Sequence, residues 1–88
     1  MSGEHPPGDA IATVTHYFTH LGVAAVSLTA PLSVGDRIHI QGHTTDLVQD
    51  VTSMEVEHAH VEKAGPGDDV ALKVIDHVRE HDRIYREA

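Results

Sequence analysis

The sequence has no cysteine and no tryptophan, and it contains only two tyrosines and one phenylalanine. Without cysteine, neither a disulfide nor a thiolate zinc site can stabilise the fold. RNA-binding sheets stack bases on exposed aromatic side chains, and this sequence has too few aromatic residues to favour such a surface. The fold must depend on one apolar cluster or on self-association, and a domain of this size buries only about 60–65% of its unfolded surface.

Four further absences restrict the function. No apolar run approaches the roughly 18 residues that a membrane span needs, and residues 1–9 lack the basic and apolar regions of a signal peptide. These features predict a cytoplasmic protein without a membrane partner. The phosphate-binding motif GxxxxGK(S/T) is missing, so we expect the protein not to bind or hydrolyse GTP. No nucleophile-elbow motif surrounds Ser27, Ser33 or Ser53, and we expect no enzyme activity.

The charge is strongly acidic, with six Lys and Arg against fourteen Asp and Glu and a net charge of −8. RNA binding depends on basic side chains that neutralise phosphates, so the few bases would have to gather on one face. An acidic surface suits a protein partner better. The candidate binding residues, for RNA or protein, are Arg37, His39, His43, Lys73, Arg83 and Arg86.

Residues 1–9 are rich in Gly and Pro and are predicted to be a flexible tail, whereas residues 10–88 form one domain. Apolar residues alternate with a period of two, which predicts an all-β barrel or sandwich. A parity change within the strand expected over 46–59 suggests a β-bulge. Phe18 is expected in the core. Residues 77–88 also fit a helix, but we favour strands joined at 80–82. The predicted strands cover 10–18, 22–29, 37–42, 46–59, 70–76 and 83–87.

A short phrase, Gly-Asp followed by a residue and then Ile or Val, recurs along the chain. Clear copies occur at 34–38 and 66–70, another near the N-terminus at 7–11, and a degenerate one at 80–84, where His81 replaces Gly. Gly supplies the positive φ that a type II turn needs at its third position, and Asp can bond the backbone nearby. The phrase therefore predicts turns that start strands.

The order of these turns and strands resembles the second domain of elongation factor Tu and related translational GTPases. The shared pattern includes L-x-V-G-D-x-I-x-I-x-G, V-x-S-M and A-x-P-G-D-x-V, and it extends over residues 12–87. The resemblance implies a closed six-stranded antiparallel β-barrel and a stand-alone, elongation-factor-like binding module. Its implied partner is transfer or ribosomal RNA, with a protein partner as the alternative. The landmarks are Gly22, Leu32, Val34, Gly35, Asp36, Ile38, Ile40, Gly42, Val51, Met54, Ala64, Pro66, Gly67, Asp68 and Val70.

Nine histidines suggest a second hypothesis, a metal-binding or pH-responsive protein. Three pairs have a spacing of four, at 16/20, 39/43 and 77/81, but residues so spaced on a strand lie about 13 Å apart and cannot share one zinc ion. His58 and His60 are expected on one strand face, about 6.6 Å apart, where they could chelate zinc or nickel adventitiously. No dedicated cofactor is expected.

Overall fold

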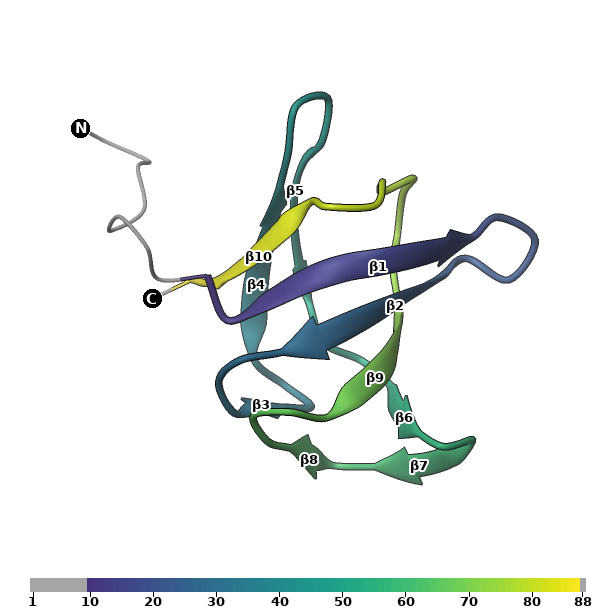
Figure 1. Ribbon diagram of the computed structural model, residues 1–88, viewed down its shortest axis with the longest axis vertical. Coiled ribbons are helices and arrows are strands. Elements are labelled where there is room, and N and C mark those ends of the chain that lie inside the picture. The colour runs from purple at the N-terminus through teal and green to yellow at the C-terminus, as the bar shows by residue number, and fades with distance from the viewer. Residues whose placement is uncertain (1–9, 88) are drawn as a thin grey trace.

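The computed structural model describes residues 10–87, and every regular element among them is a β-strand (Figure 1). None of these residues forms a helix that is long and apolar enough to cross a membrane. The strands are β1 (Ala12–Phe18), β2 (Val23–Leu28), β3 (Leu32–Ser33), β4 (Arg37–Gln41), β5 (Asp46–Asp50), β6 (Met54–Val56), β7 (Ala59–Val61), β8 (Lys63–Ala64), β9 (Asp69–Lys73) and β10 (Arg83–Arg86).

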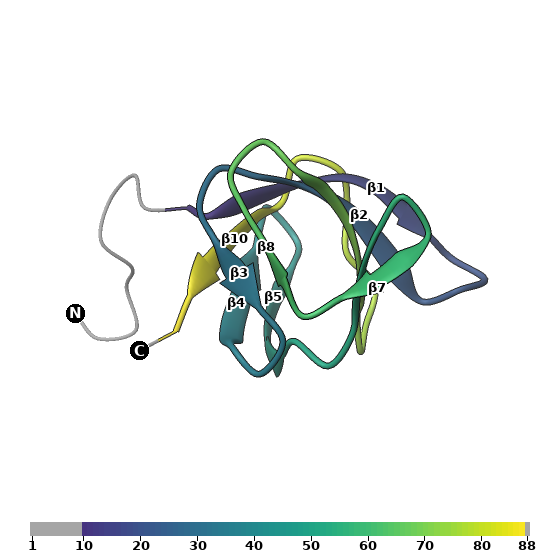
Figure 2. The ribbon, with the colours of Figure 1, turned by 90° about the horizontal axis from the view of Figure 1, so that it is seen from below.

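Eight strands form one curved antiparallel sheet in the order β5-β4-β10-β1-β2-β9-β6-β7, and β3 pairs with β8 separately (Figure 2). The prediction of an all-β antiparallel fold is confirmed. The prediction of a closed six-stranded barrel is wrong, because β5 and β7 are the two ends of the sheet and do not pair with each other. The structure is an open half-barrel.

Part of the difference in strand number comes from residues 46–59, which do not form one bulged strand. β5 ends at Asp50, residues 51–53 belong to no strand, and β6 starts at Met54 in a distant part of the sheet order. Val51 and Met54 are both buried, so the change of parity marks a break between two strands. The segment predicted to be one strand therefore contributes two strands, which lie toward opposite ends of the sheet.

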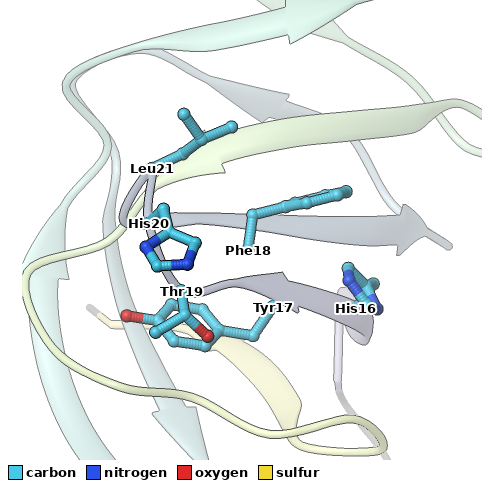
Figure 3. A pocket seen from close by; sticks show the side chains of 6 residues that line it. All are labelled: His16, Tyr17, Phe18, Thr19, His20 and Leu21. Carbon is cyan, nitrogen blue, oxygen red and sulfur yellow. The ribbon is translucent and has the colours of Figure 1, made fainter.

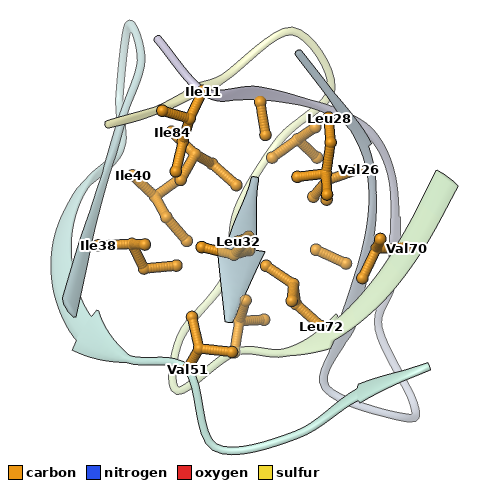
Figure 4. Close-up of a cluster of buried hydrophobic side chains, with 14 of the residues drawn as sticks. Ile11, Val26, Leu28, Leu32, Ile38, Ile40, Val51, Val70, Leu72 and Ile84 are labelled. Carbon is orange, nitrogen blue, oxygen red and sulfur yellow. The ribbon is translucent and has the colours of Figure 1, made fainter. Parts of the chain in front are cut away.

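The core fills the concave side of the sheet (Figure 4). The alternation predicted for β2, β4 and β9 is confirmed, since every second residue of these strands points inward. Leu32 of β3 lies among these side chains and is itself 1% exposed. The inward residues of the three strands are Ala24, Val26, Leu28, Ile38, Ile40, Val70 and Leu72.

Phe18 is an exception to the predicted core, with 41% of its surface exposed. The register of β1 against β2 shifts between Val14 and His16. Such a bulge moves every later side chain to the other face. As a result, Tyr17 packs against the core and Phe18 points outward, although Phe18 has the same parity as the buried Val14.

The Gly-Asp phrases form turns, as predicted. Asp36, Asp68 and Asp82 each accept a hydrogen bond at 2.9 Å, through Oδ2, from the backbone N–H three residues earlier. Each Asp also donates its own N–H to the carbonyl of that same earlier residue at 3.1 Å. The residue before each Asp has a positive φ, including His81 at 77°, so the degenerate copy is a true third turn. The tail and the Gly-Asp of the copy at 7–11 lie outside the described residues.

The C-terminal segment contains a strand, as we favoured, but a shorter one than expected. β9 stops at Lys73, and no strand occurs between residues 74 and 82. β10 then pairs with β4 over its whole length and with the beginning of β1. The last strand thereby joins the two halves of the sheet.

Candidate functional site

The convex face of the sheet carries a row of outward residues drawn from five strands. The register places His16 of β1 opposite Ala25, Ala25 opposite Ala71, Ala71 opposite Glu55, and Glu55 opposite His60. The row points outward because its neighbours along the chain, such as Ala24, Leu72 and Met54, are buried. The two alanines leave the middle of this face low.

Two adjoining hollows lie over these alanines, with volumes of about 440 Å³ and 360 Å³. They share Phe18, Glu55, His58 and Ala71, and we call their union the outer groove. The residues that line only one of the two are Leu21, Val23, Ala25, Ser53, Glu57, Asp69, Val70 and Lys73.

One end of the outer groove is apolar. Phe18 and Leu21 are 41% and 66% exposed, and Val23 lies opposite Phe18 in the sheet. The ring of His16 packs edge-on against Phe18, with 4.4 Å between the ring centroids. Exposed apolar side chains that gather in this way are typical of a binding surface.

The other end of the outer groove is acidic. Glu57 and His58 form the two-residue turn between β6 and β7, and both have positive φ, at 51° and 68°. This two-residue geometry is that of a tight hairpin turn, and it holds both side chains at the rim of the groove. With Glu55 and Asp69 the lining holds three carboxylates, against Lys73 as its one Lys or Arg.

A third hollow, of about 440 Å³, lies at the end of the β1–β2 hairpin and is lined by residues 16–21 (Figure 3). It adjoins a region where the rings of His77 and Tyr17 lie 4.6 Å apart between centroids, tilted by 40°, and where Nδ1 of His16 lies 3.5 Å from a carboxylate oxygen of Glu80. Tyr17 is half-buried, whereas His16, His77 and Glu80 are exposed, and these contacts do not form a catalytic arrangement.

The structure disperses the binding residues predicted from charge. Arg37 pairs with Asp50 at 3.2 Å, and Arg86 bonds Asp36 at 2.7 Å and the carbonyl of Pro31 at 2.5 Å. Arg83 and His43 are exposed on β10 and in the loop before β5. Lys73 alone lies in the outer groove. Two of the four cations thus have carboxylate partners within the chain itself.

His39 is a buried residue of the structure and lies away from the outer groove. It is 8% exposed, its Nε2 lies 2.5 Å from Oδ1 of Asp46, and its Nδ1 lies 3.3 Å from Oε2 of Glu87. Both ring nitrogens are therefore occupied by groups of the same chain. This arrangement ties β4 to β5 and to the C-terminal segment.

The predicted histidine pair does not share a strand face. His58 belongs to the hairpin turn and lines the outer groove, whereas His60 lies on β7 with its Nε2 3.6 Å from Glu55. Within residues 10–87, no three His, Asp or Glu side chains are grouped so as to hold a metal ion. The expected common face is wrong because a turn interrupts the strand there.

The sequence does not reveal the residues that shape the outer groove, above all Phe18, Ala25 and Ala71. Nothing in the sequence marks the two alanines as part of a binding site, because they contribute only their small size to the groove. Phe18 was expected inside because the bulge in β1 is invisible in the apolar pattern. Leu21, next to Gly22 in the β1–β2 turn, was the one apolar residue whose turn position could have indicated exposure.

No protein-family model matches the chain. It is 40% identical over 76 residues to an uncharacterized protease of Methanocaldococcus jannaschii, an alignment that covers 85% of this chain and 19% of the relative. It is 39% identical over 72 residues to a collagenase of Porphyromonas gingivalis, covering 80% of this chain and 20% of that protein. The chain therefore spans about a fifth of the length of the curated relatives it matches.

Solved structures of another small domain share the fold of this chain. The chain superposes on the C-terminal domain of a Geobacillus thermoleovorans protein assigned to the U32 peptidases, with a TM-score of 0.87 and 18% identity, over 98% of this chain and 100% of that domain. The selenomethionine variant of that domain gives a TM-score of 0.83 at 20% identity, over 90% and 99% of the two chains.

These comparisons overturn the resemblance to elongation factors. The sequence relatives are named as proteases and collagenases, and the structural neighbours are C-terminal domains of a U32 peptidase. The Gly-Asp landmarks encode type II turns and alternating strands, which any small antiparallel sheet can use. They predicted the local structure correctly and the family wrongly, so the implied translational role is wrong and the RNA partner inferred from it loses its basis.

Proposed function

We propose that this chain is a non-enzymatic module that binds polypeptides, equivalent to the C-terminal domain of a U32-type peptidase. Its sequence relatives are a protease and a collagenase, whose work requires contact with polypeptide chains. The observation that carries the proposal is the outer groove, in which exposed Phe18 and Leu21 adjoin a floor of small residues. Clefts of mostly apolar lining with a few polar groups are the usual form of a binding site.

The proposal assigns binding rather than cleavage to the module. The polar residues of the groove are carboxylates, one lysine, His58 and Ser53, and Ser53 is not part of a nucleophile motif. A polypeptide held on the convex face would be presented to a catalytic unit elsewhere. The module then contributes affinity, which lowers the concentration of substrate that the catalytic unit needs.

Gelatin is a suitable probe, because one relative is named a collagenase. We expect the purified chain to be retained on immobilised gelatin at low salt and to release no fragments from fluorescein-labelled gelatin. The variant Phe18→Ser should bind the gelatin column less well. Val48→Ser should bind it as well as the wild-type chain, since Val48 is equally exposed, at 42%, but lies on β5. Passage of the wild-type chain through the column unretained, or cleavage by the chain alone, would overturn the proposal.

A further inference from the structure

We infer that the outer groove selects an extended polypeptide segment in which an aliphatic side chain and a Lys or Arg side chain stand two residues apart. This inference rests on the proposed function and adds the chemistry of the bound segment to it. It comes from the unequal ends of the groove, one apolar and one acidic, and from the strand register that sets the distance between them.

The apolar end accepts the aliphatic side chain. Phe18 and Val23 face each other across β1 and β2, Leu21 lies in the turn beyond them, and Ala71 provides the floor. An aliphatic side chain placed over Ala71 would remove apolar surface of Phe18 and Leu21 from water. Each Å² of apolar surface buried in this way favours binding, and the gain is independent of charge.

The acidic end accepts the cation. Asp69 lies two residues before Ala71 on β9, and Glu57 lies at the rim, in the turn after β6. Lys73, the one cation of the lining, lies at the opposite end, opposite Val23. A positive side chain is therefore attracted to the Asp69 end and repelled from the Lys73 end, which fixes the end of the groove at which the basic side chain lies.

The spacing of the two ends matches an extended chain. Residues two apart on a strand, such as Ala71 and Asp69, lie about 6.6 Å apart. Side chains two apart in an extended ligand have the same separation and point to the same side. A segment of the type Leu-x-Lys that runs antiparallel to β9 thus sets Leu above Ala71 and Lys above Asp69.

Charge also disfavours the simplest alternative occupant, a second copy of the chain. Two outer grooves brought together would enclose the carboxylates of Glu55, Glu57 and Asp69 from both copies with only one lysine from each, and each chain carries a net charge of −8. Like charges placed opposite each other at an interface are unfavourable. A basic segment is the complementary partner for this surface.

The test uses fluorescence anisotropy at low salt with fluorescein-labelled Gly-Leu-Gly-Lys-Gly and two matched peptides, one with Glu in place of Lys and one with Ser in place of Leu. The wild-type chain should bind the Leu-Lys peptide at least about fivefold more tightly than either. Asp69→Asn should weaken that binding by about two- to fivefold. Asp50→Asn makes the same change in net charge on β5, outside the groove, and should have no effect.

Ala71→Gln, which fills the floor of the groove, should abolish the preference for Leu over Ser, and its thermal unfolding should be measured in parallel. Equal affinity of the wild-type chain for the Lys and Glu peptides would overturn the inference, as would equal effects of Asp69→Asn and Asp50→Asn. If gelatin is retained but the peptides are not distinguished, the inference fails and the proposed function stands. If neither gelatin nor any peptide is bound, the proposed function itself fails.

Discussion

The side-chain amide of Gln49 on β5 donates a hydrogen bond to the carbonyl of Lys73 at the end of β9, at 2.9 Å. Its carbonyl oxygen accepts from the backbone N–H of Ile75 at 3.0 Å. β5 and β9 are not neighbours in the sheet, so one side chain supplies the two bonds that an adjacent strand would otherwise make. Gln49 is 7% exposed and spans the open side of the half-barrel.

Gln49→Leu should lower the free energy of unfolding by about 1–3 kcal/mol, because the backbone groups of Lys73 and Ile75 lose partners in a partly buried position. Urea denaturation monitored by circular dichroism measures this change. Gln41→Leu is the matched control, since Gln41 is exposed at the end of β4, and it should change stability by less than about 0.5 kcal/mol. Equal losses for the two variants would contradict the role assigned to Gln49.

Gly42→Ala should be destabilising by about 1–3 kcal/mol, the usual range for overpacking. A Cβ at this position would lie 1.8 Å from Oδ1 of Asp82, a residue that is 4% exposed and whose carboxylate holds the third turn. Gly65→Ala provides the control, because its Cβ would meet nothing within 4 Å and its N–H would still bond Asp68. Thermal melts of the two variants should differ clearly, with Gly65→Ala close to wild type.

The turns allow a pair of opposite substitutions. Gly35→Ala should be destabilising by about 1–2 kcal/mol, because Gly35 has φ of 100° and a Cβ there would meet no neighbour, so only the backbone preference acts. His81→Gly should be neutral or stabilising by up to about 1 kcal/mol, since His81 has φ of 77° in the equivalent position. Loss of stability in both variants would show that the His81 side chain contributes contacts that outweigh its backbone strain.

The histidines offer a metal test. Isothermal titration of zinc into the wild-type chain and into His60→Ala should give equal heats, because His58 belongs to a turn and His60 faces Glu55 from β7. Residues 10–87 bring no third ligand of the usual kinds to this pair. A saturable heat in the wild-type chain that His60→Ala removes would establish a site at the β6–β7 hairpin.

Local physics made much of this fold predictable from the sequence. Alternating apolar residues determined which faces of β2, β4 and β9 are buried, because side chains of a strand point to opposite sides in turn. Asp36, Asp68 and the degenerate Asp82 determined three turns, since each carboxylate bonds a backbone N–H only three residues away. Interactions between residues so close in the chain can be predicted from the sequence.

Only the tertiary structure decided where the strands end, how the sheet is ordered and what the outer groove contains. The bulge in β1 turned Phe18 outward, the break after Asp50 sent one expected strand to both ends of the sheet, and Gln49 spans the open side. The groove itself joins residues as distant as Phe18 and Ala71, which meet because β2 pairs with both β1 and β9. Such pairings depend on contacts across the whole chain, and no local pattern encodes them.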